Sequence, residues 1–86
     1  MTSYAHEATL AFEYDDQRRA RVVERSVRRE VGEIDGDRSR ATVDRDGPTV
    51  RVSVEATDLV GLRAGLNTWM GLVDVAERAA TAAASD

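Results

Sequence analysis

Cysteine and lysine are absent from this sequence, and histidine occurs once, at His6. Without cysteine the chain can form neither a disulfide nor a thiolate metal site, and its redox compartment cannot be inferred. Nucleophilic catalysis needs a nucleophile beside a base, and the missing residue types are among those that most often supply such a pair. We therefore predict no catalytic residue and no enzymatic activity.

Other site-forming patterns are missing as well. The glycines are scattered singly, so no phosphate-binding loop is predicted, and no second ligand type accompanies His6 to suggest a metal site. Glu33, Asp35 and Asp37 could hold a cation from one loop, but their spacing matches no calcium-binding loop. The sequence accordingly predicts neither a metal nor a cofactor.

Long apolar runs are also missing, since none approaches the ~20 residues that span a membrane. The N-terminus lacks the charged-then-apolar layout of a signal peptide. We expect a cytoplasmic protein that does not enter a membrane.

Charged residues are plentiful, but the basic ones are of a single type and the acidic ones outnumber them. All 12 basic residues are arginine, and 16 acidic residues bring the net charge to −4. High intracellular salt screens the self-repulsion of an acidic surface, so this composition suits a halophilic cell. A GC-rich genome would also favour arginine over lysine, and the composition does not separate the two causes.

The length of 86 residues predicts one domain. A domain of this size buries only ~60–65% of its unfolded surface, so a partner or a second copy would help to stabilise it. We expect residues 6–78 to form the domain and residues 1–5 to be disordered. Residues 79–86, which are mostly alanine, are expected to form a flexible tail or to prolong the last helix weakly.

Three stretches alternate apolar and polar residues with the period of a half-buried strand. They cover residues 6–14, 39–44 and 49–55, and the Asp-Gly pair at 46–47 is a strong hairpin signal between the last two. The residues predicted to face the core are Ala8, Leu10, Phe12, Tyr14, Ala41, Val43, Val50, Val52 and Val54.

A first helix is predicted between the first two strands. The aspartate pair 15–16 is placed to cap it, and Gly32 is placed to end it after about Val31. Arginines spaced by three, four and three residues line the side opposite its apolar face, and the arginine fork suits phosphate. A solvated face neutralised by Glu24 and the acidic loops is the alternative. The arginines of this stripe are Arg18, Arg21, Arg25 and Arg28.

A second, longer helix is predicted over 57–78, and one of its first two residues is expected to cap its start. With the flanking Met70 and Leu72, its apolar arc is ~160° wide, which exceeds the ~100° that a surface helix needs. We infer that this helix contacts both its own domain and a neighbour. Its apolar stripe consists of Leu59, Leu62, Leu66, Trp69, Val73 and Ala76.

Three glycines, at 61, 65 and 71, interrupt the long helix, each at a cost of ~1 kcal/mol relative to alanine. Gly61 and Gly65 are four residues apart, so they lie on one side and would let another backbone approach closely. Neutral drift at tolerant positions is the alternative.

The predicted order of elements, strand-helix-strand-strand-helix, indicates an α+β fold. The first helix returns the chain, so the first two strands run parallel, and a third strand between them makes every neighbouring pair antiparallel. We predict a three-stranded antiparallel sheet with two helices on one face. The other face should be polar, because it carries Thr9, Ala11, Arg40, Thr42, Arg51 and Ser53.

The segment 62–69, Leu-Arg-Ala-Gly-Leu-Asn-Thr-Trp, resembles the Leu-Arg-x-x-Leu-Asn-x-aromatic signature of the small Pcc subunit of the KEOPS complex. The segment 8–14, Ala-Thr-Leu-Ala-Phe-Glu-Tyr, the glycine-turn hairpin and the order of elements are similar to that family too. The likeness covers about residues 6–77. The family more often has bulkier residues where this chain has its helix glycines, and the acidic, lysine-free composition looks like a halophilic archaeal member.

The resemblance implies a non-catalytic subunit. KEOPS installs the threonylcarbamoyl group on the adenosine beside the anticodon of certain tRNAs, and the chemistry belongs to its large transferase subunit. The Pcc subunit is similar to a dimerisation module that pairs with itself, docks the transferase through its helices and could help to hold tRNA. The implied partners are therefore a second copy, the transferase subunit, and tRNA through the assembled complex.

The polar members of the helix motif suggest where the transferase docks. Arg63, Asn67 and Met70 lie on one flank of the long helix, roughly 20–80° from its main stripe. The alternative is that Arg63 pairs with a nearby acid and Asn67 is simply solvated. The predicted partner-binding residues are Arg63, Leu66, Asn67 and Met70.

A stand-alone RNA-binding module is the alternative function. Such a module would normally be basic and would expose aromatic side chains for stacking. This chain is acidic, and Trp69 lies on the stripe that is predicted to be buried. The composition therefore favours the scaffold.

Overall fold

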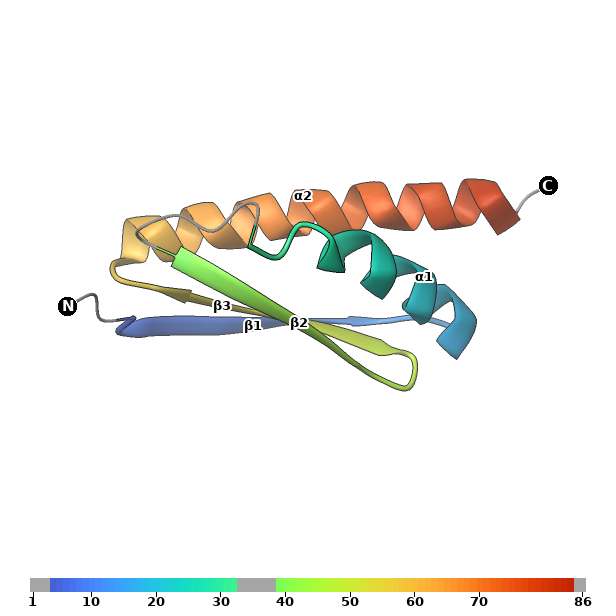
Figure 1. The fold of residues 1–86 in the computed structure, drawn as a ribbon, viewed down its shortest axis with the longest axis horizontal. Helices are drawn as coiled ribbons and strands as arrows, with labels where there is room; N and C mark the ends of the chain where they lie inside the picture. The colour runs from blue at the N-terminus through green and yellow to red at the C-terminus, as the bar shows by residue number, and fades with distance from the viewer. Residues whose placement is uncertain (1–3, 33–38, 85–86) are drawn as a thin grey trace.

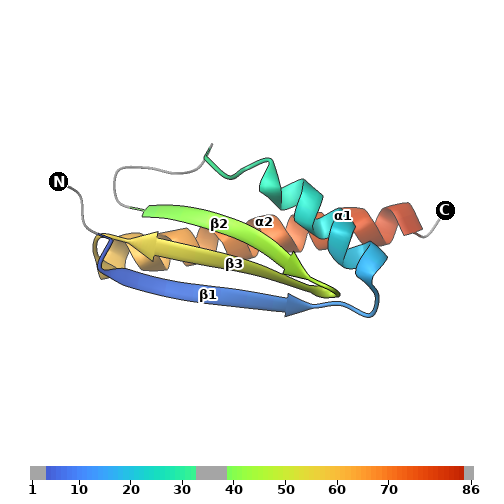
Figure 2. The same cartoon turned by 60° about the horizontal axis from the view of Figure 1, so that its bottom comes forward.

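The computed structural model describes residues 4–32 and 39–84, and it has the predicted α+β architecture. The sheet order is β1-β3-β2, and β3 pairs antiparallel with both neighbours. Both helices lie on the same face of the sheet (Figures 1 and 2). The elements are β1 (His6–Glu13), α1 (Gln17–Arg28), β2 (Ser39–Asp46), β3 (Thr49–Ala56) and α2 (Leu59–Ala84).

The core is centred on β3, the middle strand. Val50, Val52 and Val54 point toward the helices and are 0–1% exposed. Trp69 of α2 is 2% exposed and belongs to the same buried cluster, which confirms its prediction as a core residue. The stripe of α2 therefore supplies the second layer of the core, and α1 completes it with Ala20, Val23 and Val27.

Helix α1 begins as predicted and ends earlier. The Asp16 carboxylate accepts a 2.7 Å hydrogen bond from the Arg19 amide, which is the expected N-cap. After Arg28 the chain tightens into i→i+3 hydrogen bonds, of which the one from Val31 N to Arg28 O is 3.1 Å long. Val31 therefore lies beyond the helix, although it still packs on the core, and Gly32 follows with φ +88°.

Helix α2 is longer than the predicted 57–78. Asp58 caps it by accepting a 2.6 Å hydrogen bond from the Gly61 amide, and the helix continues to Ala84. Ala80 is only 8% exposed, so packing extends beyond Arg78. The alanine-rich segment thus prolongs the helix, which was the alternative to a flexible tail. Residues 1–3, 85–86 and the loop acids at 33, 35 and 37 lie outside the described residues.

One member of the predicted stripe is not buried. Leu59 is 60% exposed, whereas the buried side of α2 is centred on Trp69, Val73 and Ala80. Leu59 lies ~80° from Trp69 around the helix axis, in the first turn. The prediction that Leu59 faces the core was therefore wrong, and this leucine adds to the exposed apolar surface.

Gly65 is required by the packing of α2 on the sheet. A Cβ at this position would lie 2.9 Å from Cγ1 of Val54 on β3. The close approach predicted for this glycine therefore exists, but it is made to a strand side chain rather than to another backbone. Gly71, by contrast, has no atom within 4 Å of the corresponding Cβ position.

The second face of the sheet is polar, as predicted. Thr9 and Ser53 share a 3.0 Å hydrogen bond across β1 and β3, and Arg40 forms a 3.0 Å ion pair with Glu55 across β2 and β3. Within residues 4–32 and 39–84, neither helix combines the length and the apolarity of a membrane span.

Candidate docking surfaces

The four residues predicted to bind a partner lie together on one side of α2, which we call the α2 flank (Arg63, Leu66, Asn67, Met70). Glu77 lies on the same side, and the Tyr14 hydroxyl at the end of β1 donates a 2.7 Å hydrogen bond to it. The α2 flank therefore overlooks the β1 edge of the sheet. Met70 is 44% exposed and Leu66 is half-buried, so apolar surface remains uncovered here.

The N-terminal end of the α2 flank is hollowed. Leu59, Val60 and Arg63 line a shallow depression of about 320 Å³ together with Ala64 and Asn67. Val60 is 70% exposed and was not among the predicted site residues, because it falls outside the apolar stripe. The sequence did carry one signal for this site, because Val60 is an aliphatic residue in the first turn of the helix that does not belong to the apolar stripe.

The polar members of the α2 flank are free to bind. No hydrogen bond or ion pair joins the Arg63 guanidinium or the Asn67 amide to any described residue, and both side chains are exposed. A pairing of Arg63 with a nearby acid, which was the alternative, is therefore not present among the described residues. An apolar centre with polar groups around it matches the make-up of a protein interface.

A second hollow lies between the two helices, on the opposite side of α2. Leu72, Val75, Ala76 and Ala79 line it from α2, and its volume is about 200 Å³. Val75 is 63% exposed although it is a large aliphatic residue. The sequence-based analysis missed this groove, which is lined from α1 by Ser26 and Val27 and from the turn after it by Glu30.

The arginine stripe of α1 divides into two parts. Arg18, Arg21 and Arg25 are exposed, and no hydrogen bond or ion pair joins them to any residue within 4–32 or 39–84. Arg28 is engaged, because it pairs with Glu24 and donates a 3.1 Å hydrogen bond to the Val43 carbonyl of β2. The available positive stripe therefore consists of three of the four predicted arginines.

Glu24 ties α1 to the β2–β3 hairpin. Its carboxylate accepts hydrogen bonds from Arg28 and, at 3.3 Å, from Arg45 of β2. Partial burial acts to raise the pKa of Glu24, but the hydrogen bonds and charges of the two arginines outweigh it and lower the pKa below its ordinary value. Glu24 neutralises Arg28 and Arg45, and it does not neutralise the other three arginines of the stripe.

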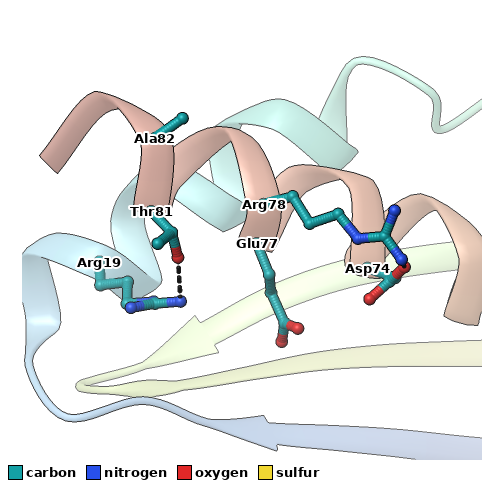
Figure 3. A pocket seen from close by; sticks show the side chains of 6 residues that line it. All are labelled: Arg19, Asp74, Glu77, Arg78, Thr81 and Ala82. Carbon is teal, nitrogen blue, oxygen red and sulfur yellow. Dashed lines mark hydrogen bonds and ion pairs between the residues drawn. The ribbon is translucent and has the colours of Figure 1, made fainter. Parts of the chain in front are cut away.

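Charged side chains also line a hollow of about 420 Å³ near the C-terminal end of α2 (Figure 3). Arg19 reaches across from α1 and donates a 2.7 Å hydrogen bond to the Thr81 hydroxyl. Arg78 pairs with Asp74 at 2.8 Å, and Glu77 accepts from Tyr14. Arg78 and Asp74 neutralise each other, and the hydrogen bonds of Arg19 and Glu77 join α1, α2 and the end of β1.

The described residues offer no convergent metal-binding group, since no three histidine, aspartate or glutamate side chains among them gather around one point. The structure instead offers three exposed surfaces that could bind a partner. They are the α2 flank, the groove between the helices, and the arginine stripe.

Comparison with known proteins matches this chain to a protein family and to solved structures. The model of a protein family, described as "Transcription factor Pcc1", matches residues 7–81. A solved structure described as "Crystal structure of binary complex Gon7-Pcc1" contains a chain similar to this one, with a TM-score of 0.79 and 14% sequence identity. The similarity covers 90% of this chain and 94% of that chain, and at this identity it shows the fold alone. No curated protein sequence matches.

Proposed function

This chain belongs to the Pcc1 family, and we propose that it is a non-catalytic scaffold subunit of the KEOPS complex. In this role it pairs with a second copy and docks the catalytic transferase subunit, which makes threonylcarbamoyl-adenosine in tRNA. The observation that carries the proposal is the exposed apolar surface of α2, where Leu59, Val60 and Met70 remain 44–70% exposed in a domain with a small core. Burial of this surface against a partner would stabilise both the complex and the domain.

The transferase docks on the α2 flank. Met70 and Leu66 supply the apolar centre, and Arg63 and Asn67 supply polar groups that no described residue satisfies. The similar solved chain is named as part of a binary complex, which supports binding to another protein as the role of this fold.

The test measures binding of the purified chain to the KEOPS transferase subunit. Met70→Glu places a charge at the centre of the α2 flank and should abolish binding while the circular dichroism spectrum stays native. Val75→Glu is the matched control, because Val75 is also exposed and apolar but lies on the opposite side of the same helix. Normal binding by Met70→Glu together with loss of binding by Val75→Glu would move the docking site to the groove between the helices.

The arginine stripe contributes to tRNA binding within the assembled complex. Arg18, Arg21 and Arg25 are exposed, and arginine forms bidentate hydrogen bonds with phosphate. A dimer would carry the stripe twice. Its contribution depends on ionic strength, because phosphate contacts weaken as salt rises.

A stand-alone nucleic-acid-binding module is the second candidate function. The exposed Arg18, Arg21 and Arg25 favour it, and the family description names a transcription factor. Trp69 argues against it, because a side chain that is 2% exposed cannot stack on a base. Tight tRNA or DNA binding by this chain alone at physiological salt would support the module over the scaffold.

A further inference from the structure

The hollow near the C-terminal end of α2 is lined by two charged side chains that have no ionic partner among the described residues (Figure 3). They are Arg19, which projects from α1, and Glu77, which projects from α2, and both are partly buried. Each forms a hydrogen bond with a neutral hydroxyl instead, Arg19 with Thr81 and Glu77 with Tyr14. A cation and an anion therefore line the same hollow without pairing with each other.

Arg19 has more hydrogen-bond donors than its described neighbours accept from. A guanidinium carries five N–H groups, and the 2.7 Å bond to Thr81 uses one of them, on Nη2. The Nε atom is buried, and no described residue accepts a hydrogen bond from it. A buried donor on a charged group is costly to leave unpaired. The Arg19 side of the hollow therefore favours a ligand that brings oxygen acceptors.

Glu77 offers the opposite chemistry. The Tyr14 hydroxyl donates to Oε2 of Glu77 at 2.7 Å, and Oε1 has no partner among the described residues. An ionised carboxylate only accepts hydrogen bonds, and it accepts several. The Glu77 side of the hollow therefore favours a ligand that brings donors.

The separation of the two groups follows from helical geometry. Thr81 lies four residues beyond Glu77, and side chains at this spacing have Cβ atoms ~5–6 Å apart. Because Arg19 is bonded to Thr81, its guanidinium lies about one helical turn from the Glu77 carboxylate. This gap is wider than the ~4 Å of a direct ion pair. It matches a ligand that carries an acceptor and a donor close together.

The remaining charges of the hollow balance each other. Arg78 and Asp74 form a 2.8 Å ion pair, and both line the hollow. With Arg19 and Glu77 included, the net charge is zero. A simple anion at Arg19 would be repelled by Glu77, and a simple cation at Glu77 would be repelled by Arg19. A molecule that carries both charges leaves the balance unchanged, and a volume of about 420 Å³ accommodates a small one.

We propose that this hollow binds a free α-amino acid as its zwitterion. The carboxylate of the ligand accepts hydrogen bonds from Arg19, and its ammonium group donates to Oε1 of Glu77. The bound ligand joins α1 to α2 beside the end of β1, and it stabilises the folded domain because it binds the folded state alone. The site shares no residue with the α2 flank or the arginine stripe, so it goes beyond the scaffold role and does not depend on it.

Titration of the native chain, followed by nuclear magnetic resonance, tests the proposal without any substitution. L-Alanine is the probe, acetate carries only its anionic half, and methylammonium carries only its cationic half. We expect saturable shifts of the Glu77 and Thr81 amide signals with L-alanine. Its dissociation constant should be at least about tenfold below that of either half, because the second contact of a linked ligand forms within one molecule. Ionic strength is held constant, since salt screens these charges.

Two substitutions locate the site. Arg19→Gln removes the cation, and Glu77→Gln removes the anion while it keeps an oxygen that accepts from Tyr14. Each should raise the dissociation constant for L-alanine by about tenfold or more, because one of the two ligand charges loses its partner. Arg21→Gln is the matched control, since Arg21 also projects from α1 but does not line the hollow. Circular dichroism checks that each variant is folded.

Each alternative result is decisive. Acetate that binds as tightly as L-alanine overturns the zwitterion and leaves a simple anion site. The absence of a saturable shift with L-alanine overturns the site altogether. Native affinity in folded Arg19→Gln or Glu77→Gln, or an equal loss in Arg21→Gln, shows that the amino acid binds elsewhere and overturns the assignment to this hollow. The scaffold role stands or falls separately, because these measurements include no transferase subunit.

Discussion

Gly65 of α2 lies so close to Val54 of β3 that a Cβ on the glycine would come within 2.9 Å of the Val54 Cγ1 atom. Real Cβ atoms are not found at such contacts, so the absence of a side chain sets how near the helix lies to the sheet. The glycine lowers the intrinsic stability of the helix by ~1 kcal/mol, and the dense packing it permits offsets that cost.

Alanine substitutions at two glycines of α2 should have opposite effects. Gly65→Ala forces Val54 or the helix to move, and we expect a loss of about 1–3 kcal/mol in the free energy of unfolding. Gly71→Ala meets open space and should stabilise the helix by about 0.5–1 kcal/mol. Urea denaturation of both variants measures the difference. Equal stabilisation by the two alanines would show that Gly65 is not a packing residue.

Trp69 should be essential for folding. Trp69→Ala removes a side chain that is 2% exposed, at an expected cost of about 3–5 kcal/mol, which could unfold so small a domain. Met70→Ala removes a neighbouring side chain that is 44% exposed and should cost much less. Thermal unfolding followed by circular dichroism compares them. Undiminished stability of Trp69→Ala would mean that the tryptophan serves binding, which would favour the nucleic-acid module.

Stability should fall in the alkaline range because of Tyr14. Burial raises the pKa of the Tyr14 hydroxyl well above its usual range, and the hydrogen bond to Glu77 raises it further. A group whose pKa is higher in the folded state than in the unfolded state contributes to the stability of the folded state. For a tyrosine this contribution is complete below the unfolded pKa of about 10, and it is lost progressively as the pH rises above that value.

The variant Tyr14→Phe removes both the hydrogen bond and this titration. It should lower the free energy of unfolding by about 1 kcal/mol at neutral pH and flatten its decline above about pH 10. Urea denaturation between pH 7 and pH 11 provides the profile. A variant with the same alkaline decline as the native chain would assign the decline to another group.

Glu24 should matter in the opposite pH range. Its pKa lies below the ordinary 4.5, so its contribution is present above that value and is lost as pH falls through the folded pKa. Glu24→Gln should lower the free energy of unfolding by about 1–2 kcal/mol at pH 7 and should match the native chain in strong acid. Glu7→Gln, at an exposed position with no ion pair among the described residues, controls for the change in net charge.

Replacement of Arg18, Arg21 and Arg25 by glutamine tests the arginine stripe. We expect weaker tRNA binding by the assembled complex and a shallower dependence of affinity on salt, with unchanged dimerisation. Arg28 is left intact, because its bonds to Glu24 and Val43 hold α1 on the sheet. Arg29→Gln serves as a single-charge comparison. If affinity and salt slope both stay at native values, the stripe is solvated surface.

Much of the fold was predictable because apolar residues recur with the period of a strand in some segments and with the period of a helix in others. Alternation in β1 and β3, the Asp-Gly hairpin signal, and the spacing of Val23 and Val27 each indicate the element that the structure contains. The order of elements then left few topologies, and the observed order β1-β3-β2 is the predicted one. Helix ends were less predictable, since the tightening after Arg28 and the extension to Ala84 depend on packing.

The candidate sites were less predictable for a related reason. Helical geometry placed Arg63, Asn67 and Met70 on one flank. It could not show that Arg63 has no ionic partner among the described residues, or that Val60 and Val75 are exposed. Arg28 had the same spacing as the other stripe arginines and yet bonds to a carbonyl of β2. Spacing along one helix carries no information about the strand that packs beside it.

Local pattern thus determined the elements, their order and the buried side of each, because backbone geometry gives a helix and a strand fixed periods. The tertiary structure decided which arginine is occupied and where α2 leaves apolar surface uncovered. These features depend on contacts between residues far apart in the sequence, such as Arg28 with Val43 and Gly65 with Val54.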